Sequence, residues 1–253
     1  MRTLLVALLL LVGLAAPAHA AEPQPLPTGT DVDYQLGGPA YVPDNVGIVV
    51  RDRTEEPAPG AYNICYVNGF QTQPDAKAYW RKHRDLLLKD AGGRLVEDEA
   101  WGEWLFDVRT AAKREKLAKV VGGWTKGCAR DGYDAVEYDN LDSFTRSRGL
   151  MKAKHAKAFA RLLTAKAHDA GLAVGQKNWA TLDGTRLGFD FAVSEECGRY
   201  DECGDYVDHF GDQVLVIEYR AQDFAKTCRD YGDLLAVVLR DLDLSPDGVR
   251  RWC

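Results

Sequence analysis

Short apolar runs, most of them ending in polar residues, recur along the whole chain. They are rich in β-branched and aromatic residues and mostly lack the alternation of a strand with one solvent-facing side. Strands that are buried on both faces, as in a parallel sheet, have this pattern. The pattern therefore predicts eight strands, at Val32–Leu36, Val46–Val50, Tyr62–Val67, Ala135–Tyr138, Leu172–Gly175, Phe189–Ser194, Val214–Ile217 and Leu235–Leu239.

Helical patterns separate several of these runs. The clearest spans Leu150–Ala170, where apolar residues repeat at helical spacing from Phe159 to Ala167 and Gly171 follows as a stop signal. The other predicted helices are Ala76–Ala91, Thr110–Ala129 and Gln222–Tyr231.

Strands and helices that alternate in this way predict an α/β fold, a single (β/α)₈ barrel. The first crossovers are short, so helix 1 is expected to be short or missing. The segment Trp101–Val108 is either a ninth short strand or the start of a helix. A doubly wound open sheet is the alternative architecture. Because no glycine-rich phosphate loop follows any strand, a nucleotide-binding version of that sheet has no support.

The first 20 residues have the composition of a secretory signal peptide. Met1 and Arg2 form a positive start, Thr3–Ala16 is almost wholly apolar, and residues 18–20 supply a small-x-small cleavage pattern. A membrane anchor is the alternative, but the apolar run of about 14 residues is shorter than the roughly 20 that span a bilayer. We therefore expect a secreted chain with no membrane segment after cleavage, in which residues 21–30 form a lead-in and residues 31–253 the barrel.

The net charge restricts the partners of the protein. The 38 acidic and 32 basic residues give −6, which becomes −7 when Arg2 leaves with the signal peptide. An acidic chain is poorly suited to nucleic acid and better suited to a cationic or neutral partner. The 46% of hydrophobic residues is typical of a soluble globular domain, which we expect to be monomeric.

Six cysteines, an even number, favour disulfides in an exported chain. Six cysteines allow 15 pairings. Their order along the chain suggests Cys65–Cys128, Cys197–Cys203 and Cys228–Cys253. The chain has no CxxC pair and its five histidines are scattered, which argues against a zinc site.

Polar groups gather where the predicted strands end, which is where barrel enzymes place their active sites. Ordinary strand termination explains one or two such residues but explains a ring of carboxylates, amides and aromatics less well. Carboxylates without thiol or serine machinery suit glycoside hydrolysis, which needs one acid and a second carboxylate. No GxSxG elbow or HExxH motif is present, and the polar neighbours of Lys177 favour hydrogen bonding over a Schiff base. Aromatics near the strand ends could stack on sugar rings, although core packing is the commoner role for each; they are Tyr34, Tyr66, Tyr138, Trp179 and Tyr219.

Six runs, in order along the chain, carry a resemblance. They are DVDYQLGG (Asp31–Gly38), CYVNGF (Cys65–Phe70), EYDNLD (Glu137–Asp142), QKN (Gln176–Asn178), FAVSEEC (Phe191–Cys197) and IEY (Ile217–Tyr219). Together they resemble glycoside hydrolase family 114, the endo-α-1,4-polygalactosaminidases. The resemblance implies a (β/α)₈ barrel and a secreted enzyme that cuts α-1,4-linked, at least partly deacetylated galactosamine polymers. It also implies a retaining mechanism with two carboxylates and no cofactor.

The resemblance also points to the catalytic pair. The family's strand-4 aspartate maps onto Asp139 and its strand-6 glutamate onto Glu195, with Glu196 as the alternative. We assign Asp139 as the nucleophile and Glu195 as the general acid/base, about 5–5.5 Å apart in a retaining enzyme. Glu137 shares the face of Asp139 by strand alternation, so its charge could raise the pKa of the acid.

Further strand-end residues are predicted to bind substrate. Candidate partners for the substrate amines are Asp33, Asp52, Glu218 and Asp241, with salt bridges to Arg51, Arg53 or Arg240 as the alternative. The other predicted binding residues are Tyr34, Asn68, Glu137, Tyr138, Asn140, Lys177, Asn178, Glu196 and Tyr219. Two other functions stay open: a secreted barrel that binds an amino-sugar polymer without cutting it, and a hydrolase of a different glycan.

Overall fold

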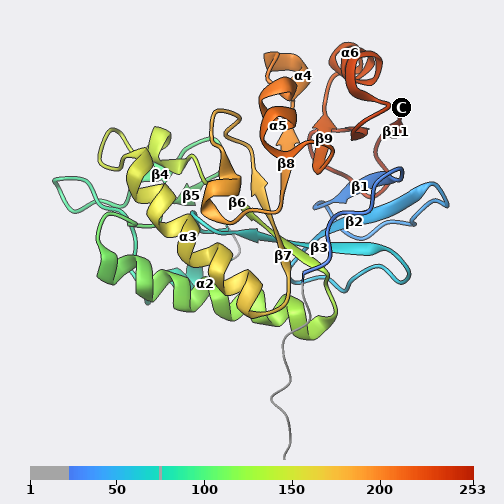
Figure 1. Ribbon diagram of the computed structural model, residues 1–253. Coiled ribbons are helices and arrows are strands. Elements are labelled where there is room, and N and C mark those ends of the chain that lie inside the picture. The colour runs from blue at the N-terminus through green and yellow to red at the C-terminus, as the bar shows by residue number, and fades with distance from the viewer. Residues whose placement is uncertain (1–22, 74–75) are drawn as a thin grey trace, which may run out of the picture.

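The computed structural model describes residues 23–73 and 76–253, so the predicted signal peptide lies outside the described residues. Eight parallel strands are hydrogen-bonded in the order β1-β2-β3-β6-β7-β8-β9-β10 (Figure 1). Their bounds are β1 Asp31–Gln35, β2 Val46–Asp52, β3 Tyr62–Asn68, β6 Ala135–Asp139, β7 Ala173–Lys177, β8 Phe191–Glu195, β9 Val214–Glu218 and β10 Ala236–Arg240. All eight predicted strands are present within two residues of their expected bounds, and the prediction of a (β/α)₈ barrel is confirmed.

The barrel closes where the last parallel strand meets the first. β1 and β10 lie side by side, and Nη1 of Arg240 donates to the carbonyl oxygen of Tyr34. A further strand, β11 (Arg250–Trp252), which the sequence did not predict, pairs antiparallel with β10. Its Trp252 Nε1 donates to the Val32 carbonyl oxygen at 2.8 Å, which ties the chain end to β1.

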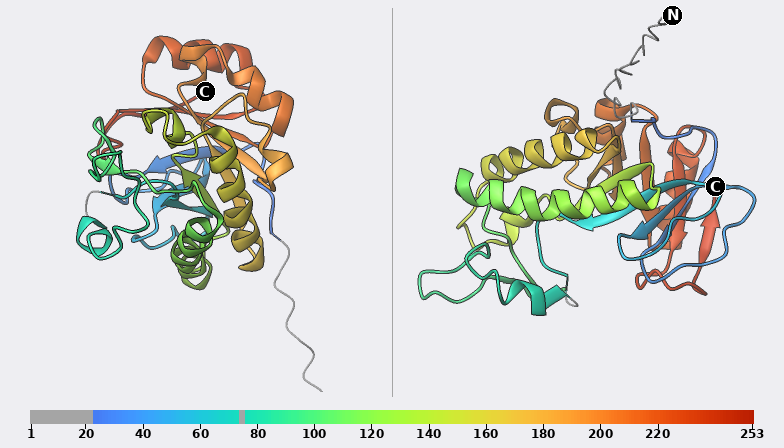
Figure 2. Two further views of the ribbon diagram at one scale, coloured as in Figure 1. Left: turned by 90° about the vertical axis from the view of Figure 1, so that its left-hand side faces the viewer. Right: turned by 90° about the horizontal axis from the view of Figure 1, so that it is seen from below.

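The helical layer covers only part of the barrel (Figure 2). Within the described residues, the loops after β1 and β2 contain no helix, as the short first crossovers predicted, and β7 is followed by the 3₁₀ helix η3 (Gly184–Leu187). The longest helix of the described residues, α2 (Ala111–Asp131), begins after the N-cap Thr110 and is capped at its end by Gly132, whose φ of 95° favours glycine. The other helices of the described residues are α1 Lys77–Trp80, η2 Ser143–Arg146, α3 Ala153–Asp169, α4 Cys197–Tyr200, α5 Cys203–Phe210 and α6 Ala221–Tyr231.

The helix predicted over Ala76–Ala91 is wrong beyond the single turn of α1. The consecutive residues Leu86, Leu87 and Leu88 are all buried, which one face of a helix cannot achieve. Their backbone instead forms strand-like bonds, because Leu88 N donates to Leu105 O at 2.8 Å. The segment Trp101–Val108 supplies β5 (Glu103–Trp104), which pairs antiparallel with β4 (Glu97–Asp98) in a hairpin inserted between β3 and α2.

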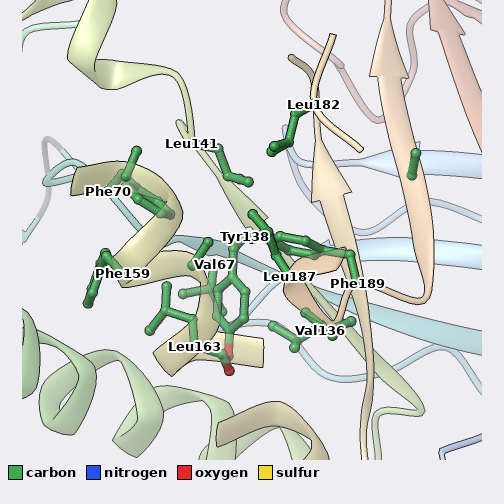
Figure 3. Close-up of a cluster of buried hydrophobic side chains, with 14 of the residues drawn as sticks. Val67, Phe70, Val136, Tyr138, Leu141, Phe159, Leu163, Leu182, Leu187 and Phe189 are labelled. Atoms are coloured by element: carbon green, nitrogen blue, oxygen red, sulfur yellow. The ribbon is translucent and has the colours of Figure 1, made fainter. Parts of the chain in front are cut away.

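Both faces of the barrel strands are buried, which explains their apolar runs. The outer face of β6 sends Val136 and Tyr138 into a cluster with Phe70, Phe159 and Leu163 beneath the helices (Figure 3). Burial of each such side chain stabilises the fold by about 1.5–3 kcal/mol. The alternate residues of β6, which include Glu137 and Asp139, therefore point to the barrel interior and its mouth.

Three disulfides hold the loops, and all three predicted pairings are confirmed. Cys65–Cys128 joins β3 to α2, Cys197–Cys203 closes the short loop that contains α4, and Cys228–Cys253 joins α6 to the chain end. The described residues include no helix that combines enough length with enough apolar character to cross a membrane.

Candidate active site

The carboxyl ends of the strands surround a cleft of about 820 Å³. Barrel enzymes carry their active sites at this end. The side chains come from strand ends, from the loops that follow them and from the β4–β5 hairpin. Seven predicted site residues line the cleft: Asp139, Asn140, Lys177, Asn178, Glu195, Glu196 and Tyr219.

Lys177, at the end of β7, joins the two predicted catalytic carboxylates. Its side chain is only 1% exposed, and its Nζ lies 3.1 Å from Glu195 Oε2 and 3.7 Å from Asp139 Oδ2. These two oxygens are therefore at most 6.8 Å apart, the sum of the two distances. Burial alone would lower the pKa of Lys177, but Asp139, Glu195 and Glu137 together raise it well above its ordinary value. A permanently charged ammonium is a poor Schiff-base nucleophile, which needs a free amine.

Glu195, the last residue of β8, is held by three neighbouring side chains. Its Oε1 accepts a short hydrogen bond from Tyr219 OH, and its Oε2 accepts from Asn178 Nδ2 at 3.1 Å and pairs with Lys177. The backbone N–H of Glu195 also donates to Asn178 Oδ1 at 2.9 Å, so the side-chain amide of Asn178 fixes both the backbone and the carboxylate of Glu195. Burial opposes ionisation, but Lys177, Tyr219 and Asn178 outweigh it and hold the pKa of Glu195 below its ordinary value.

The neighbouring Glu196 also lines the cleft but has different partners. Its φ of 61° turns the chain sharply after the strand, and its Oε1 forms a salt bridge with Arg199 Nη1 at 2.7 Å. This arrangement supports Glu195, rather than Glu196, as the partner of Asp139.

Asp139, the last residue of β6, accepts hydrogen bonds on both oxygens. Tyr66 OH donates to Oδ2 at 2.8 Å, and the backbone N–H of Asn140 donates to Oδ1 at 2.6 Å. Asn140 adopts a left-handed φ of 65°, which asparagine tolerates better than most residues. Burial, together with Asp139, raises the pKa of Tyr66, so the phenol keeps its proton and donates.

Glu137 and Tyr34 form a buried layer beneath the cleft. Tyr34 OH donates to Glu137 Oε1 at 2.5 Å and accepts from Lys177 Nζ at 2.7 Å. Glu137 Oε2 has no hydrogen-bond partner among the described residues. Burial raises the pKa of Glu137 to about 7, although Lys177 and Tyr34 act in the opposite direction. Glu137 thus lies beneath the predicted catalytic pair, but the rise expected in the pKa of the acid is absent, because Lys177, Tyr219 and Asn178 hold the pKa of Glu195 below its ordinary value.

The β4–β5 hairpin brings two further carboxylates, Asp98 and Glu103, into the cleft. Asn68 Nδ2 donates to Glu103 Oε2 at 2.9 Å, and burial raises the pKa of Glu103 to about 7. Asp98 Oδ2 pairs with Arg146 Nε at 2.7 Å. Sequence reasoning missed all three charged residues, because they do not follow a barrel strand directly. The one sequence signal for this hairpin was the segment Trp101–Val108, which was expected to form either a short strand or the start of a helix.

Acidic side chains outnumber basic ones around the cleft by eight to two. One of the two basic groups, Arg146, is also bound by Asp142 at 2.9 Å. Such an excess of negative charge attracts a cationic ligand. The charged lining residues are Asp98, Glu103, Asp139, Asp142, Glu195, Glu196, Glu202, Asp243, Arg146 and Lys177.

Two of the predicted amine-binding carboxylates are buried elsewhere in the barrel. Asp33 pairs with Arg240 at 3.1 Å and with Arg250 at 2.9 Å, the salt-bridge alternative for this residue. Glu218 Oε1 accepts from the backbone N–H of Gly198 at 2.7 Å, beneath α4. Its nearest cysteine sulfurs belong to a disulfide, so they are not thiolate metal ligands. Neither carboxylate lines the cleft.

Three more predicted binding residues also lie outside the lining. Asp52 accepts from Gln73 Nε2 at 2.8 Å, and Asp241 accepts from the backbone N–H of Ser245 at 2.9 Å. Tyr138 points to the helices, where its hydroxyl lies 2.7 Å from Thr125 Oγ1 (Figure 3). Asn68 and Tyr34, in contrast, contact cleft residues from below.

Comparison with known proteins gives matches of family and of fold. The structure is similar to that of Aspergillus fumigatus Ega3 in complex with galactosamine, with a TM-score of 0.71 and 20% identity over 93% of this chain and 100% of that one. It is also similar to the glycoside hydrolase domain of PelA from Pseudomonas aeruginosa, with a TM-score of 0.60 and 17% identity over 87% and 97% of the two chains. A search of curated protein sequences gives no match.

The family model of glycoside hydrolase family GH114 matches residues 13–253. This match covers nearly the whole chain and agrees with the resemblance carried by the six sequence runs. The chain therefore belongs to glycoside hydrolase family GH114 and is a glycoside hydrolase.

Proposed function

We propose that this enzyme cuts α-1,4-linked galactosamine polymers, at least partly deacetylated, at internal bonds. The observation that carries the proposal is the acidic cleft around the carboxylates that share Lys177. Deacetylated galactosamine carries an ammonium near neutral pH, so negative charge attracts it and opposes an anionic glycan. The similarity to Ega3, whose structure contains galactosamine, supports the same substrate class.

The chemistry proposed for the pair is a double displacement. Asp139 attacks the anomeric carbon while Glu195 gives its proton to the glycosidic oxygen, so the C–O bond breaks and a covalent glycosyl–enzyme forms. Glu195 then takes a proton from water, which attacks the same carbon and releases Asp139. A retaining pair lies about 5–5.5 Å apart. The limit of 6.8 Å between the two oxygens that contact Lys177 is compatible with this spacing.

The surrounding groups have defined roles in this proposal. Tyr66 and the Asn140 N–H orient Asp139, and Asn178 orients Glu195. The low pKa of Glu195 keeps it ionised in the free enzyme, whereas a general acid must carry a proton. Burial raises the pKa of Glu195, and a sugar ring over the site increases this contribution by excluding water. The acid role thus requires that substrate binding protonate Glu195.

Export is part of the proposal. Three disulfides fit an oxidising compartment, since disulfides are rare in the cytosol. We expect removal of residues 1–20 and activity as a monomer, without a cofactor.

The substrate is tested by incubating the enzyme with three α-1,4-linked polymers: deacetylated galactosamine, fully N-acetylated galactosamine and anionic galacturonan. New reducing ends from the deacetylated polymer, with products of mixed length, support an endo-acting enzyme. If only one of the other two polymers is cleaved, the enzyme is a hydrolase of that glycan. Binding of a polymer without new reducing ends identifies a binding protein. Proton NMR of the first product distinguishes the mechanisms, because retention gives the α-anomer and inversion the β-anomer.

The role of each carboxylate is tested by azide rescue. With Asp139→Gly, azide should replace the missing nucleophile and give a β-glycosyl azide. With Glu195→Gly, it should attack the preserved covalent intermediate and give an α-glycosyl azide. The opposite pair of products would exchange the two roles.

A further inference from the structure

Two exposed aromatic side chains line the cleft away from Lys177. Trp101 is 62% exposed and Tyr200 is 59% exposed, and both belong to the lining of the same cleft. Most large aromatics of this fold are buried in the two main cores or pack against them. An exposed ring in a cleft exposes apolar surface that a ligand can cover.

Trp101 lies on a hairpin that is fastened to the rest of the barrel. It occupies the turn between β4 and β5, and its backbone N–H donates to Asp98 O at 3.2 Å. The Asp98–Arg146 ion pair holds the base of the hairpin to η2 at 2.7 Å. A ring on a fastened turn loses little conformational freedom when a ligand binds.

Tyr200 is fixed by the short α4 turn. The Cys197–Cys203 disulfide closes this turn, which starts and ends at residues in the left-handed region, Glu196 and Asp201. The guanidinium carbon of Arg199 lies 5.2 Å from the centre of the Tyr200 ring, and the same guanidinium pairs with Glu196. One ring face is therefore occupied by a cation that a cleft carboxylate holds in place, and the rest of the ring is exposed.

The two aromatics lie at opposite ends of the run of strands that carries the predicted catalytic pair. The hairpin follows β3 and α4 follows β8, which itself carries Glu195, while β6 with Asp139 and β7 with Lys177 lie between these strands in the sheet order. The hairpin and α4 are accordingly separated on the rim of the barrel (Figure 1). A cleft carboxylate lies three or four residues before each ring in the sequence, Asp98 before Trp101 and Glu196 before Tyr200, and each of these two is paired with an arginine.

We propose that Trp101 and Tyr200 form two outer sugar-binding sites, one on each side of the bond that is cut. At each site the ring packs against the C–H face of one hexose, and the overall excess of acidic side chains around the cleft attracts the amines of the polymer. This inference rests on the proposed function, since it takes the galactosamine polymer as the ligand. It predicts that the enzyme binds a long chain more tightly than a short one.

The test compares ligands of two lengths on variants that cannot cut them. In a Glu195→Gln background, calorimetry gives the dissociation constants of a galactosamine disaccharide and of an octasaccharide for Trp101→Ala, Tyr200→Ala and a control, Tyr41→Ala. Tyr41 is 75% exposed and does not line the cleft. Each cleft variant should bind the octasaccharide roughly tenfold more weakly, as for truncation of an aromatic anchor. The disaccharide constant and the control should not change.

Other outcomes overturn the proposal in distinguishable ways. Octasaccharide binding that stays unchanged in both cleft variants overturns the outer sites alone. Equal loss for both ligands shows a disturbed centre and also overturns them. If the parent Glu195→Gln variant binds neither ligand while wild type cuts neither, the substrate class itself is wrong and the inference fails with it. Digests of long polymer by the single variants give a second readout, in which loss of an outer site should change the product lengths.

Discussion

Replacing Lys177 by methionine should destabilise the protein strongly, because it removes the one cation among three carboxylates. Its Nζ contacts Asp139 at 3.7 Å and Glu195 at 3.1 Å, and it reaches Glu137 through Tyr34. Breaking a buried pair by removal of one partner costs about 3–5 kcal/mol. Methionine keeps most of the side-chain volume, so the charge is the main change.

The loss should depend on pH in a direction that follows from the carboxylates. Without Lys177, burial should raise the folded pKa of Glu195 above its unfolded value. A carboxyl group with a raised folded pKa stabilises the folded state only while it is protonated. The free energy of unfolding of the variant should therefore be close to that of wild type near pH 4 and drop below it as pH rises to 7.5. With a urea m-value of about 2–3 kcal/mol/M, the midpoint at pH 7.5 should fall by roughly 1.5 M.

Urea unfolding followed by tryptophan fluorescence at several pH values measures this effect. Lys119→Met, at an exposed position of α2, is the matched control and should leave the midpoint unchanged. A Lys177→Met variant that unfolds at the wild-type urea concentration at pH 7.5, or whose loss of stability does not shrink at low pH, would contradict this role of the buried ammonium.

Two further predictions concern stability. The folded pKa of Glu137 is about 7 against an ordinary 4.5, so the unfolding free energy of wild type should fall by up to about 3 kcal/mol as pH rises from 4.5 to 7. Glu137→Gln should flatten this part of the stability curve, measured by urea titration, and parallel curves for the two proteins would contradict the raised pKa. Cys253→Ser should cost about 3 kcal/mol, because the Cys228–Cys253 bridge closes a loop over a sequence separation of 25 and holds β11. Cys228→Ser should show the same loss in thermal unfolding, and additive losses in the double variant would refute this explanation.

The barrel strands could be predicted from the sequence because both their faces are buried. Their apolar runs therefore end where the strands end, and the polar residues that follow, such as Asp139, Lys177 and Glu195, reach the cleft. The segment 76–91 could not be predicted in this way, since its buried leucines lie in an irregular insertion and pair with the hairpin segment that follows, as Leu87 does with Phe106.

The same limit applies to the site. Strand alternation placed Glu137 and Asp139 on one face, but it gave no information on which strand-end carboxylates already have a partner. Asp33 is taken by Arg240 and Arg250, and both arginines lie more than two hundred residues away in the chain. Asp98 and Glu103 reach the cleft through the hairpin. Such long-range pairings depend on the closed barrel and leave no local pattern.

Release of reducing ends from deacetylated α-1,4-galactosamine polymer tests the central claim most directly. The measurement compares wild type with Asp139→Asn, Glu195→Gln and the control Glu196→Gln, after circular dichroism shows that all four are folded. Loss of either proposed catalytic carboxylate should lower the rate by about 10³-fold or more, whereas Glu196→Gln should stay within roughly tenfold of wild type. Activity retained by Glu195→Gln, together with a collapse in Glu196→Gln, would contradict the account.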